Sequence, residues 1–369
     1  MSNAFALPPL PPFNSIPAHI HTVDDYEQQA QKHLAPDVWA YLQGGAMEEH
    51  SIHDNRESFQ HIKLLPRALQ DLRGGHTRCH LLGTTYVHPV FLAPVAYQKL
   101  FHPDAETATA QAAHAMQSNM LVSSFASSYL EDIAAHHQGW FQLYWQNSRE
   151  NTLKLVRQAE THHFKAIVVT VDAPHAGIRD RERRAGFKLP EHISAVNIQA
   201  GHQAINVTGQ QHVLFDGLMA IAPRWDDIAW LLQQTSLPIL LKGILHPADA
   251  LQAVNIGVQG LIISNHGGRI LDTVISPLEA LPAIRQLIPA PFPILLDSGI
   301  RRGHDIFKAL ALGASAVLVG RPYIYGLAVA GALGAAHVIR ILKEELEVTM
   351  ALCGTARLDD ISSAHILSG

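Results

Sequence analysis

Residues 260–269 read GLIISNHGGR, a short apolar run that ends in polar and glycine-rich residues. The run carries apolar side chains on both alternating faces, as a parallel strand covered on both sides requires. The same pattern recurs along the chain, and each run leads through a polar or glycine-rich turn into a helical pattern. The runs cover residues 90–95, 120–125, 140–145, 166–172, 238–243, 260–266, 293–299 and 316–322.

Alternation of strands and helices implies right-handed crossovers and a parallel sheet. Because there are eight such units, we expect a closed (β/α)₈ barrel of the TIM-barrel type rather than an open sheet. Residues 325–350 are predicted to form a closing helix pair. The other predicted helices cover residues 104–117, 149–160, 225–234, 247–254 and 304–312.

Two segments depart from this rhythm. Residues 1–21 are proline-rich (LPPLPPF at 7–13) and are predicted to be a flexible tail, which leaves residues 22–369 as one barrel domain that begins with a helical segment over 22–60. About 65 residues separate residue 172 from residue 238, where a βα unit needs roughly 30. Residues 187–223 are therefore predicted to be a long loop after strand 4, the fourth of the eight predicted strands (residues 166–172). This loop is either a lid or a surface excursion.

Composition limits the class of protein. The 369 residues are 47% hydrophobic and 16% charged, which suits a large core, and a net charge of -5 gives no field for nucleic acid or an anionic membrane. Two cysteines exclude a disulfide-dense scaffold, although one disulfide stays possible. With neither a secretory signal pattern nor a run of 18 apolar residues, we expect a cytoplasmic protein.

In such a barrel the reactive groups lie at the carboxyl ends of the strands. Strands 7 and 8 both end in glycine followed closely by arginine, a pattern that predicts a phosphate site, with tight turns and surface pairing as the alternative. Neither a G-x-G-x-x-G motif nor a P-loop follows any run, so a Rossmann or Walker nucleotide site is not expected.

Strands 4, 5 and 6 end in ionisable side chains. His266 is aimed into the barrel mouth, where Asp172 could hold it as a general base. Arg269 and Arg179 could fork onto a substrate carboxylate. Lys242 ends an apolar strand, so it forms a Schiff base, stabilises a cofactor or pairs with a carboxylate. The histidines lack metal-ligand spacing, so no metal is expected.

The motifs at these strand ends resemble those of the FMN-dependent α-hydroxy-acid oxidase/dehydrogenase family, which includes glycolate, lactate and 4-hydroxymandelate oxidases. The likeness extends from about residue 22 to the C-terminus. It is carried by SNHGGR at 264–269, Tyr41 with GGA at 44–46, APVA at 93–96, FQLY at 141–144, TVD at 170–172, KG at 242–243, DSGIRRG at 297–303 and GRP at 320–322.

The resemblance implies FMN as cofactor and a role for each matching residue. His266 would be the base that takes either the α-proton or the hydroxyl proton, Asp172 would stabilise its charged form, and Tyr144 would bind the substrate oxygen. The substrate carboxylate would meet Tyr41, Arg179 and Arg269. FMN would be held by Pro94, Val95, Ala96, Ser123, Gln142, Thr170, Lys242, Ser264, Asp297, Gly299, Arg301, Gly320 and Arg321.

The sequence departs from the family pattern near the expected substrate side chain. Val95 stands where many members have threonine, Phe125 where glycolate oxidases have tryptophan, and Tyr97 where methionine is frequent. Ser298 replaces a common glycine and Ile270 a common glutamine. These positions leave glycolate, lactate, longer aliphatic and mandelate-type acids open.

The resemblance implies oxidation of a small L-2-hydroxy acid to the 2-oxo acid, with O₂ as the expected acceptor and H₂O₂ as product. The alternative is a soluble L-lactate or mandelate-type dehydrogenase that passes its electrons to a quinone or an artificial acceptor. Relatives imply a homotetramer or homo-octamer. A Lys242 aldolase and a non-catalytic flavin- or phosphate-binding barrel are the rival interpretations.

Overall fold

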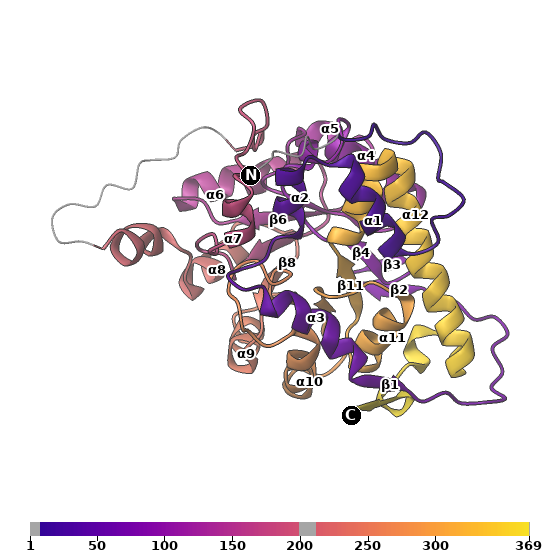
Figure 1. The fold of residues 1–369 in the computed structure, drawn as a ribbon. Helices are drawn as coiled ribbons and strands as arrows, with labels where there is room; N and C mark the ends of the chain where they lie inside the picture. The colour runs from indigo at the N-terminus through magenta and orange to yellow at the C-terminus, as the bar shows by residue number, and fades with distance from the viewer. Residues whose placement is uncertain (1–7, 199–211, 369) are drawn as a thin grey trace.

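In a computed structural model, residues 8–198 and 212–368 are described, and eight parallel strands surround a central core (Figure 1). Neighbouring strands follow the order β4-β11-β10-β9-β8-β7-β6-β5, and a parallel bridge from Leu92 to Met120 joins the two ends of that sheet. The predicted (β/α)₈ barrel is therefore confirmed. The strands are β4 (Val90–Leu92), β5 (Leu121–Ser123), β6 (Trp140–Tyr144), β7 (Ile167–Thr170), β8 (Ile239–Ile244), β9 (Gly260–Ile263), β10 (Ile294–Leu296) and β11 (Ala316–Val319).

The double-sided apolar pattern of the strands has a direct structural cause. In β9, Leu261 and Ile263 pack in the large cluster shared with the helices, whereas Ile262 packs in a second cluster with residues of the other barrel strands. All four residues of β9 are buried. The strands end before most of the predicted runs do, because the polar residues that follow have already turned into the loops.

Helices cover the outside of the barrel, and all five helices predicted between the strands are present. Two more were not predicted, the short α5 and α10, which has Pro282 inside it and begins with a capping box at Ser276. The helices of this layer are α4 (Ala105–Ala115), α5 (Leu130–Ala134), α6 (Arg149–Thr161), α8 (Trp225–Leu232), α9 (Pro247–Asn255), α10 (Pro277–Leu287) and α11 (Gly303–Ala311).

The last helix, α12 (Arg321–Cys353), is apolar and long enough to cross a membrane by length and composition. However, 72% of its most apolar window is buried inside the protein, and Ala330 and Gly331 leave helical geometry within it. It packs against α1, α4 and α11 (Figure 1). Among the described residues it is thus a broken core helix, as the predicted closing pair requires.

The N-terminal helical segment forms α1 (Val23–His33), α2 (Pro36–Gln43) and α3 (His50–Gln60). Thr22 caps α1 by accepting a hydrogen bond from the Asp25 backbone N–H at 3.1 Å. The described part of the predicted tail contacts α1 and α12: the Leu10 N–H donates to the Lys32 carbonyl of α1, the Phe13 N–H donates to the Val329 carbonyl of α12, and Ile20 is buried. Residues 1–7 lie outside the described residues, and both the flexibility of the tail and a domain boundary at residue 22 stay predictions.

Two small antiparallel sheets were not predicted. Strands β1 (Ile62–Leu64) and β12 (Ile366–Ser368) join distant ends of the chain, and β2 (Cys79–Leu81) forms a hairpin with β3 (Thr84–Tyr86). The hairpin packs against the core inside the barrel, where the Tyr86 ring lies 4.6 Å from that of Phe91. Both cysteines are free, which answers the open disulfide question.

The long segment after β7 contains helical pieces as well as loop. They are α7 (Asp180–Arg184), η2 (Val213–Leu218) and η3 (Met219–Ile221), while residues 199–211 lie outside the described residues. The described parts, including residues 194–195, 197–198, 218–219 and 221–223, line the cavity at the barrel mouth. The expected position of this segment on the active-site face is therefore confirmed, whereas a lid function stays a prediction.

Candidate active site

A cavity of about 980 Å³ opens at the carboxyl ends of the barrel strands. Pockets that bind small molecules span about 300–1,000 Å³, so this one has room for a cofactor together with a small substrate. Three of the predicted site residues, Asp172, Gln142 and Ser264, lie behind its wall. The others line it: Tyr41, Pro94, Val95, Ala96, Ser123, Tyr144, Thr170, Arg179, Lys242, His266, Arg269, Asp297, Gly299, Arg301, Gly320 and Arg321.

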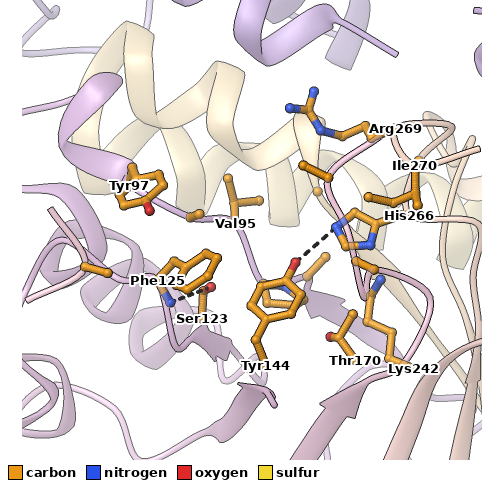
Figure 2. Close-up of a pocket in the computed structure, with 18 of the residues that line it drawn as sticks. Val95, Tyr97, Ser123, Phe125, Tyr144, Thr170, Lys242, His266, Arg269 and Ile270 are labelled. Atoms are coloured by element: carbon orange, nitrogen blue, oxygen red, sulfur yellow. Dashed lines mark hydrogen bonds between the residues drawn. The ribbon is translucent and has the colours of Figure 1, made fainter. Parts of the chain in front are cut away.

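His266 lies between two partners, as Figure 2 shows for one of them. Its Nδ1 is 2.9 Å from Asp172 Oδ1, and its Nε2 is 3.2 Å from the Tyr144 hydroxyl. Burial raises the pKa of Asp172, but the charges of His266 and Lys242 outweigh burial and leave the pKa below its usual value. An ionised Asp172 accepts from Nδ1–H, so Nε2 of the neutral ring is the basic nitrogen, and it faces the cavity.

The backbone around His266 takes an uncommon conformation. His266, Gly267 and Gly268 all have φ in the left-handed region, at 59°, 65° and 74°. Such a run is costly for a residue with a side chain, so the surroundings must hold it. The hydroxyl of Ser264 does so by accepting the His266 N–H at 3.1 Å.

An amide pair fixes this loop from outside the barrel. Asn55 of α3 and Asn265 exchange two side-chain hydrogen bonds of 2.9 and 2.7 Å, and Asn265 Oδ1 also accepts from the Gly268 N–H. Both amides are buried. Asn55 is a residue that sequence reasoning missed, because nothing in the sequence places it beside a loop more than 200 residues away.

Gly243 has φ +105°, and a Cβ there would lie 2.4 Å from the Cβ of Asp172. A side chain at this position would therefore push Asp172 away from His266. The KG pair at the end of β8 is explained by this close approach.

The Lys242 ammonium is buried below His266 (Figure 2). It donates to the Ser264 hydroxyl at 2.8 Å and lies 3.3 Å from Asp297 Oδ2. Burial lowers its pKa, but Asp297 and Asp172 outweigh burial and raise it above the usual value. A lysine held charged is a poor nucleophile, so the geometry argues against a Schiff base at this position.

A row of neutral polar side chains crosses three neighbouring strands. Ser123 on β5 donates to Gln142 Oε1 on β6 at 3.1 Å, and Gln142 Nε2 donates to the Thr170 hydroxyl on β7 at 2.9 Å. The two hydrogen bonds of Gln142 fix the positions of the Ser123 and Thr170 side chains, which line the cavity. The row can hydrogen-bond a planar polar ring laid across it.

One corner of the cavity, called here the carboxylate corner, contains Arg179, Arg269 and Tyr41. Arg269 Nη1 donates to the carbonyls of Tyr41 and Gly44, and its guanidinium lies 5.1 Å from the Tyr41 ring. Both arginines also donate to Glu182 Oε1 on α7, Arg179 at 3.1 Å and Arg269 at 3.0 Å. Glu182 was not predicted, because its RDRERR surroundings suggest a solvated helix face.

A second corner, called here the phosphate corner, contains Arg301, Arg321 and the N-terminus of α12, and it meets the carboxylate corner at the Gly44 carbonyl, which accepts from both Arg269 and Arg321. Arg321 donates to the backbone carbonyls of Leu42, Gly44 and Gly267, and burial lowers its pKa to about 10. Arg301 Nε is buried and has no hydrogen-bond partner among the described residues.

The unpaired Arg301 Nε and the open N-terminus of α12 make this corner suitable for a bound phosphate. A Cβ built on Gly320 would have only the Ala93 Cβ near it, at 3.8 Å, so the N-terminus of α12 is open to a ligand. A helix N-terminus with two guanidiniums is an anion site. Gly299, by contrast, is explained by packing, because a Cβ there would lie 1.9 Å from the Asn55 carbonyl.

An aromatic wall completes the cavity (Figure 2). The ring of Phe125 stacks between those of Tyr97, at 5.9 Å, and Tyr144, at 4.8 Å, and Val95 also lines the cavity. Three of the five departures from the family pattern, Val95, Tyr97 and Phe125, thus lie on one side of the cavity, whereas Ile270 lies on the other side, beside His266 (Figure 2). Burial raises the pKa of Tyr144, so its hydroxyl stays protonated and can donate.

Comparison with known proteins identifies the family. The FMN-dependent dehydrogenase model matches residues 30–368. An L-lactate oxidase of Roseobacter sp. (strain GAI101) is 48% identical over 344 residues, which cover 92% of this chain and 93% of that protein. Glycolate oxidase 1 of Oryza sativa subsp. indica is 40% identical, with 94% and 95% covered.

Solved structures agree. A mandelate oxidase crystallised with (S)-2-phenylpropionate superposes with a TM-score of 0.86 at 36% identity, covering 95% of this chain and 98% of that one. The matched residues span the barrel and both corners of its cavity. This chain therefore belongs to the FMN-dependent dehydrogenase family, among the 2-hydroxy-acid oxidases.

Proposed function

We propose that this protein oxidises small L-2-hydroxy acids to 2-oxo acids, with O₂ as electron acceptor and H₂O₂ as product. The observation that carries the proposal is His266, held between Asp172 and Tyr144 and facing a cavity with one corner for a carboxylate and another for a phosphate. FMN is the cofactor of the family, and it supplies the acceptor for the two electrons that leave the substrate.

The residues of the carboxylate corner orient the substrate. Arg179 and Arg269 present charged donors for its carboxylate, and the protonated Tyr144 hydroxyl can donate to its 2-oxygen. Because its carboxylate and its 2-oxygen are both held, the acid can still rotate only about the line that joins these two contacts. The aromatic wall restricts that rotation. This arrangement turns binding energy into orientation of C2 and its hydroxyl group.

His266 then accepts a proton from the bound acid at Nε2. The substrate loses two electrons and two protons in all: His266 takes one proton, and the two electrons together with the other proton would pass to the bound cofactor. His266 holds its proton until solvent or product removes it. Asp172 stabilises the imidazolium, because its carboxylate stays ionised and 2.9 Å from Nδ1. Lys242 would stabilise negative charge on the reduced cofactor, since its ammonium is buried and charged.

L-lactate is the substrate we favour among the small acids. The wall of Val95, Tyr97 and Phe125 is apolar and suits a methyl group. Two relatives, 48% and 47% identical, are L-lactate oxidases of Roseobacter sp. and Alicycliphilus denitrificans. Their names also support O₂ as acceptor.

The test is anaerobic bleaching of the protein-bound flavin with glycolate, L-lactate, L-2-hydroxybutyrate and L-mandelate, followed by admission of air. We expect L-lactate to bleach the flavin fastest, and air to restore its absorbance with one H₂O₂ formed per flavin. Flavin that stays reduced in air but reoxidises with a quinone would support the dehydrogenase alternative. No bleaching by any of the four acids would contradict the proposal.

We also propose a cytoplasmic homotetramer or homo-octamer, by analogy with relatives. Light scattering on the purified protein measures the assembly, and fractionation of the source cells measures the location. A monomer, or recovery with membranes, would contradict these two points without affecting the chemistry.

A further inference from the structure

We propose that Glu182 sets the charge selectivity of the carboxylate corner, so that the corner favours an acid with one carboxylate over an acid with two. This inference rests on the proposed function, because it concerns the same substrate site. Glu182 contacts the arginines rather than the substrate, so it is a positioning residue.

The contacts of Glu182 link both arginines through one carboxylate. Its Oε1 accepts from Arg179 Nη1 and from Arg269 Nη2, and its Oε2 accepts from Arg179 Nη1 at 3.2 Å. All three side chains are 20% exposed or less. Removed from most of the solvent, these charges interact more strongly than surface pairs do.

The two guanidiniums repel each other. Burial lowers the pKa of Arg269, the charge of Arg179 lowers it further, and Glu182 opposes both effects. With Glu182 in place, the corner carries one positive charge that is not compensated by these three residues. A substrate with a single carboxylate compensates that charge, whereas a second carboxylate would leave an excess of negative charge.

Glu182 also leaves donors for the substrate. Arg269 spends Nη1 on the carbonyls of Tyr41 and Gly44, and Nη2 on Glu182. Among the described residues, Arg269 Nε and the Nε and Nη2 of Arg179 have no hydrogen-bond partner. The internal carboxylate thus uses one edge of each fork and keeps other donors available to a carboxylate in the cavity.

The position of Glu182 is itself fixed from the N-terminal segment. Arg181, the residue before Glu182 in α7, forms an ion pair with Glu49, and Glu49 also accepts from the Gly45 N–H at 3.0 Å. A Cβ built on Gly44 would lie 3.4 Å from the Cγ of Glu182. The carboxylate is therefore held against the loop that carries the accepting carbonyls.

Asp180 provides a matched comparison on the same helix. It lies 3.9 Å from Arg183 and 3.8 Å from Arg184, with 35% of its side chain exposed, and no described contact joins its side chain to Arg179 or Arg269. Removing its charge changes the net charge of α7 by the same amount as removing that of Glu182. The control thus matches the change in charge but lacks the contact with the arginine pair, and its carboxylate is more exposed.

The experiment measures the dissociation constants of oxalate and oxamate by isothermal titration of the FMN-loaded protein. The two anions have nearly the same shape and differ by one charge. The proteins compared are the unmodified chain, Glu182→Gln, Glu182→Asp and the control Asp180→Asn. Flavin content and circular dichroism are recorded for each, and the ratio of the two constants cancels a general loss of affinity.

We expect Glu182→Gln to shift the ratio toward oxalate by about tenfold, because one negative charge has left the corner. Glu182→Asp and Asp180→Asn should keep the original ratio within about twofold, since the first retains the charge and the second is remote from the arginines. An unchanged ratio in Glu182→Gln, or an equal shift in Asp180→Asn, would overturn the inference while leaving the proposed function intact.

Two further outcomes concern anions that do not bind and a variant that does not fold. If neither anion binds the unmodified protein, both the carboxylate corner and the role of Glu182 are overturned. If Glu182→Gln does not fold, Glu182→Asp decides: a shift toward oxalate despite the retained charge would contradict a charge-based role.

Discussion

The two corners of the cavity each contain two arginines, yet the arginines have different surroundings. In the carboxylate corner, Glu182 pairs with both guanidiniums, whereas Arg301 and Arg321 in the phosphate corner have no ion pair among the described residues. A phosphate monoester carries about -1.5 to -2 charge at neutral pH, against -1 for a carboxylate. The acidic partners of the two arginine pairs thus match the charges of the ligands that we propose for the two corners.

Replacing His266, which belongs to neither corner, should have the strongest effect on activity. We expect His266→Ala to slow anaerobic flavin reduction by L-lactate about 10²–10⁴-fold, because the general base is lost. Both corners are intact in this variant, so flavin content and oxamate affinity should match the unmodified protein. Stopped-flow absorbance measures the rate, and near-normal reduction would remove His266 from its assigned role.

The phosphate corner is tested by Arg321→Ala. Loss of charged hydrogen bonds should weaken FMN binding by about 10- to 100-fold, measured by fluorescence of released flavin at equilibrium. Arg302→Ala is the control, because Arg302 pairs with Glu345 and does not line the cavity. Equal FMN affinity in Arg321→Ala and the unmodified protein would show that this corner does not hold the phosphate.

The carboxylate corner is tested by Arg269→Lys. An ammonium cannot reproduce the planar fork, so we expect the KM for L-lactate to rise about tenfold while FMN affinity stays unchanged. Arg183→Lys, at an exposed position on α7, controls for the same substitution elsewhere. A loss of FMN with an unchanged KM would reverse the assignment of the two corners.

The smallest effect concerns stability at Asp172, which lies behind His266. Burial raises its pKa, but His266 and Lys242 outweigh burial and lower it. A carboxyl with a lowered pKa in the folded state stabilises that state above its unfolded value, and the stabilisation is lost as pH falls through the folded value.

Denaturant unfolding of the unmodified protein and Asp172→Asn measures this effect between pH 3 and pH 7. The free-energy difference between the two should be constant near neutral pH and should shrink once the pH falls below about 3.9, the ordinary pKa of an aspartate. A difference that grows as the pH falls would show that Asp172 is protonated in the folded protein.

The sequence predicts the barrel well because its signal is local and repeated. Each strand is a run such as GLII at 260–263, buried on both faces, and eight repeats leave one closed architecture. Helix α10 escapes prediction because Pro282 interrupts its pattern. Strands β1 and β12 escape because each is only three residues long and its partner lies at the far end of the chain.

The candidate site divides in the same way. Residues at strand ends, such as Lys242 and His266, could be predicted because the barrel sends all strand ends to one face. Glu182 and Asn55 could not, since their partners are 87 and 210 residues away and depend on how α7 and α3 pack. The Arg179–Glu182 spacing is visible in the sequence, but it is equally typical of a surface pair.

The hairpin of β2 and β3 limits how substrate and product can reach and leave the active-site cavity. The hairpin packs on the core residues Phe91 and Trp140 and covers the end of the barrel opposite the cavity. Substrate and product therefore do not pass through this end of the barrel, and among the described residues the cavity at the carboxyl ends of the strands is the route open to both.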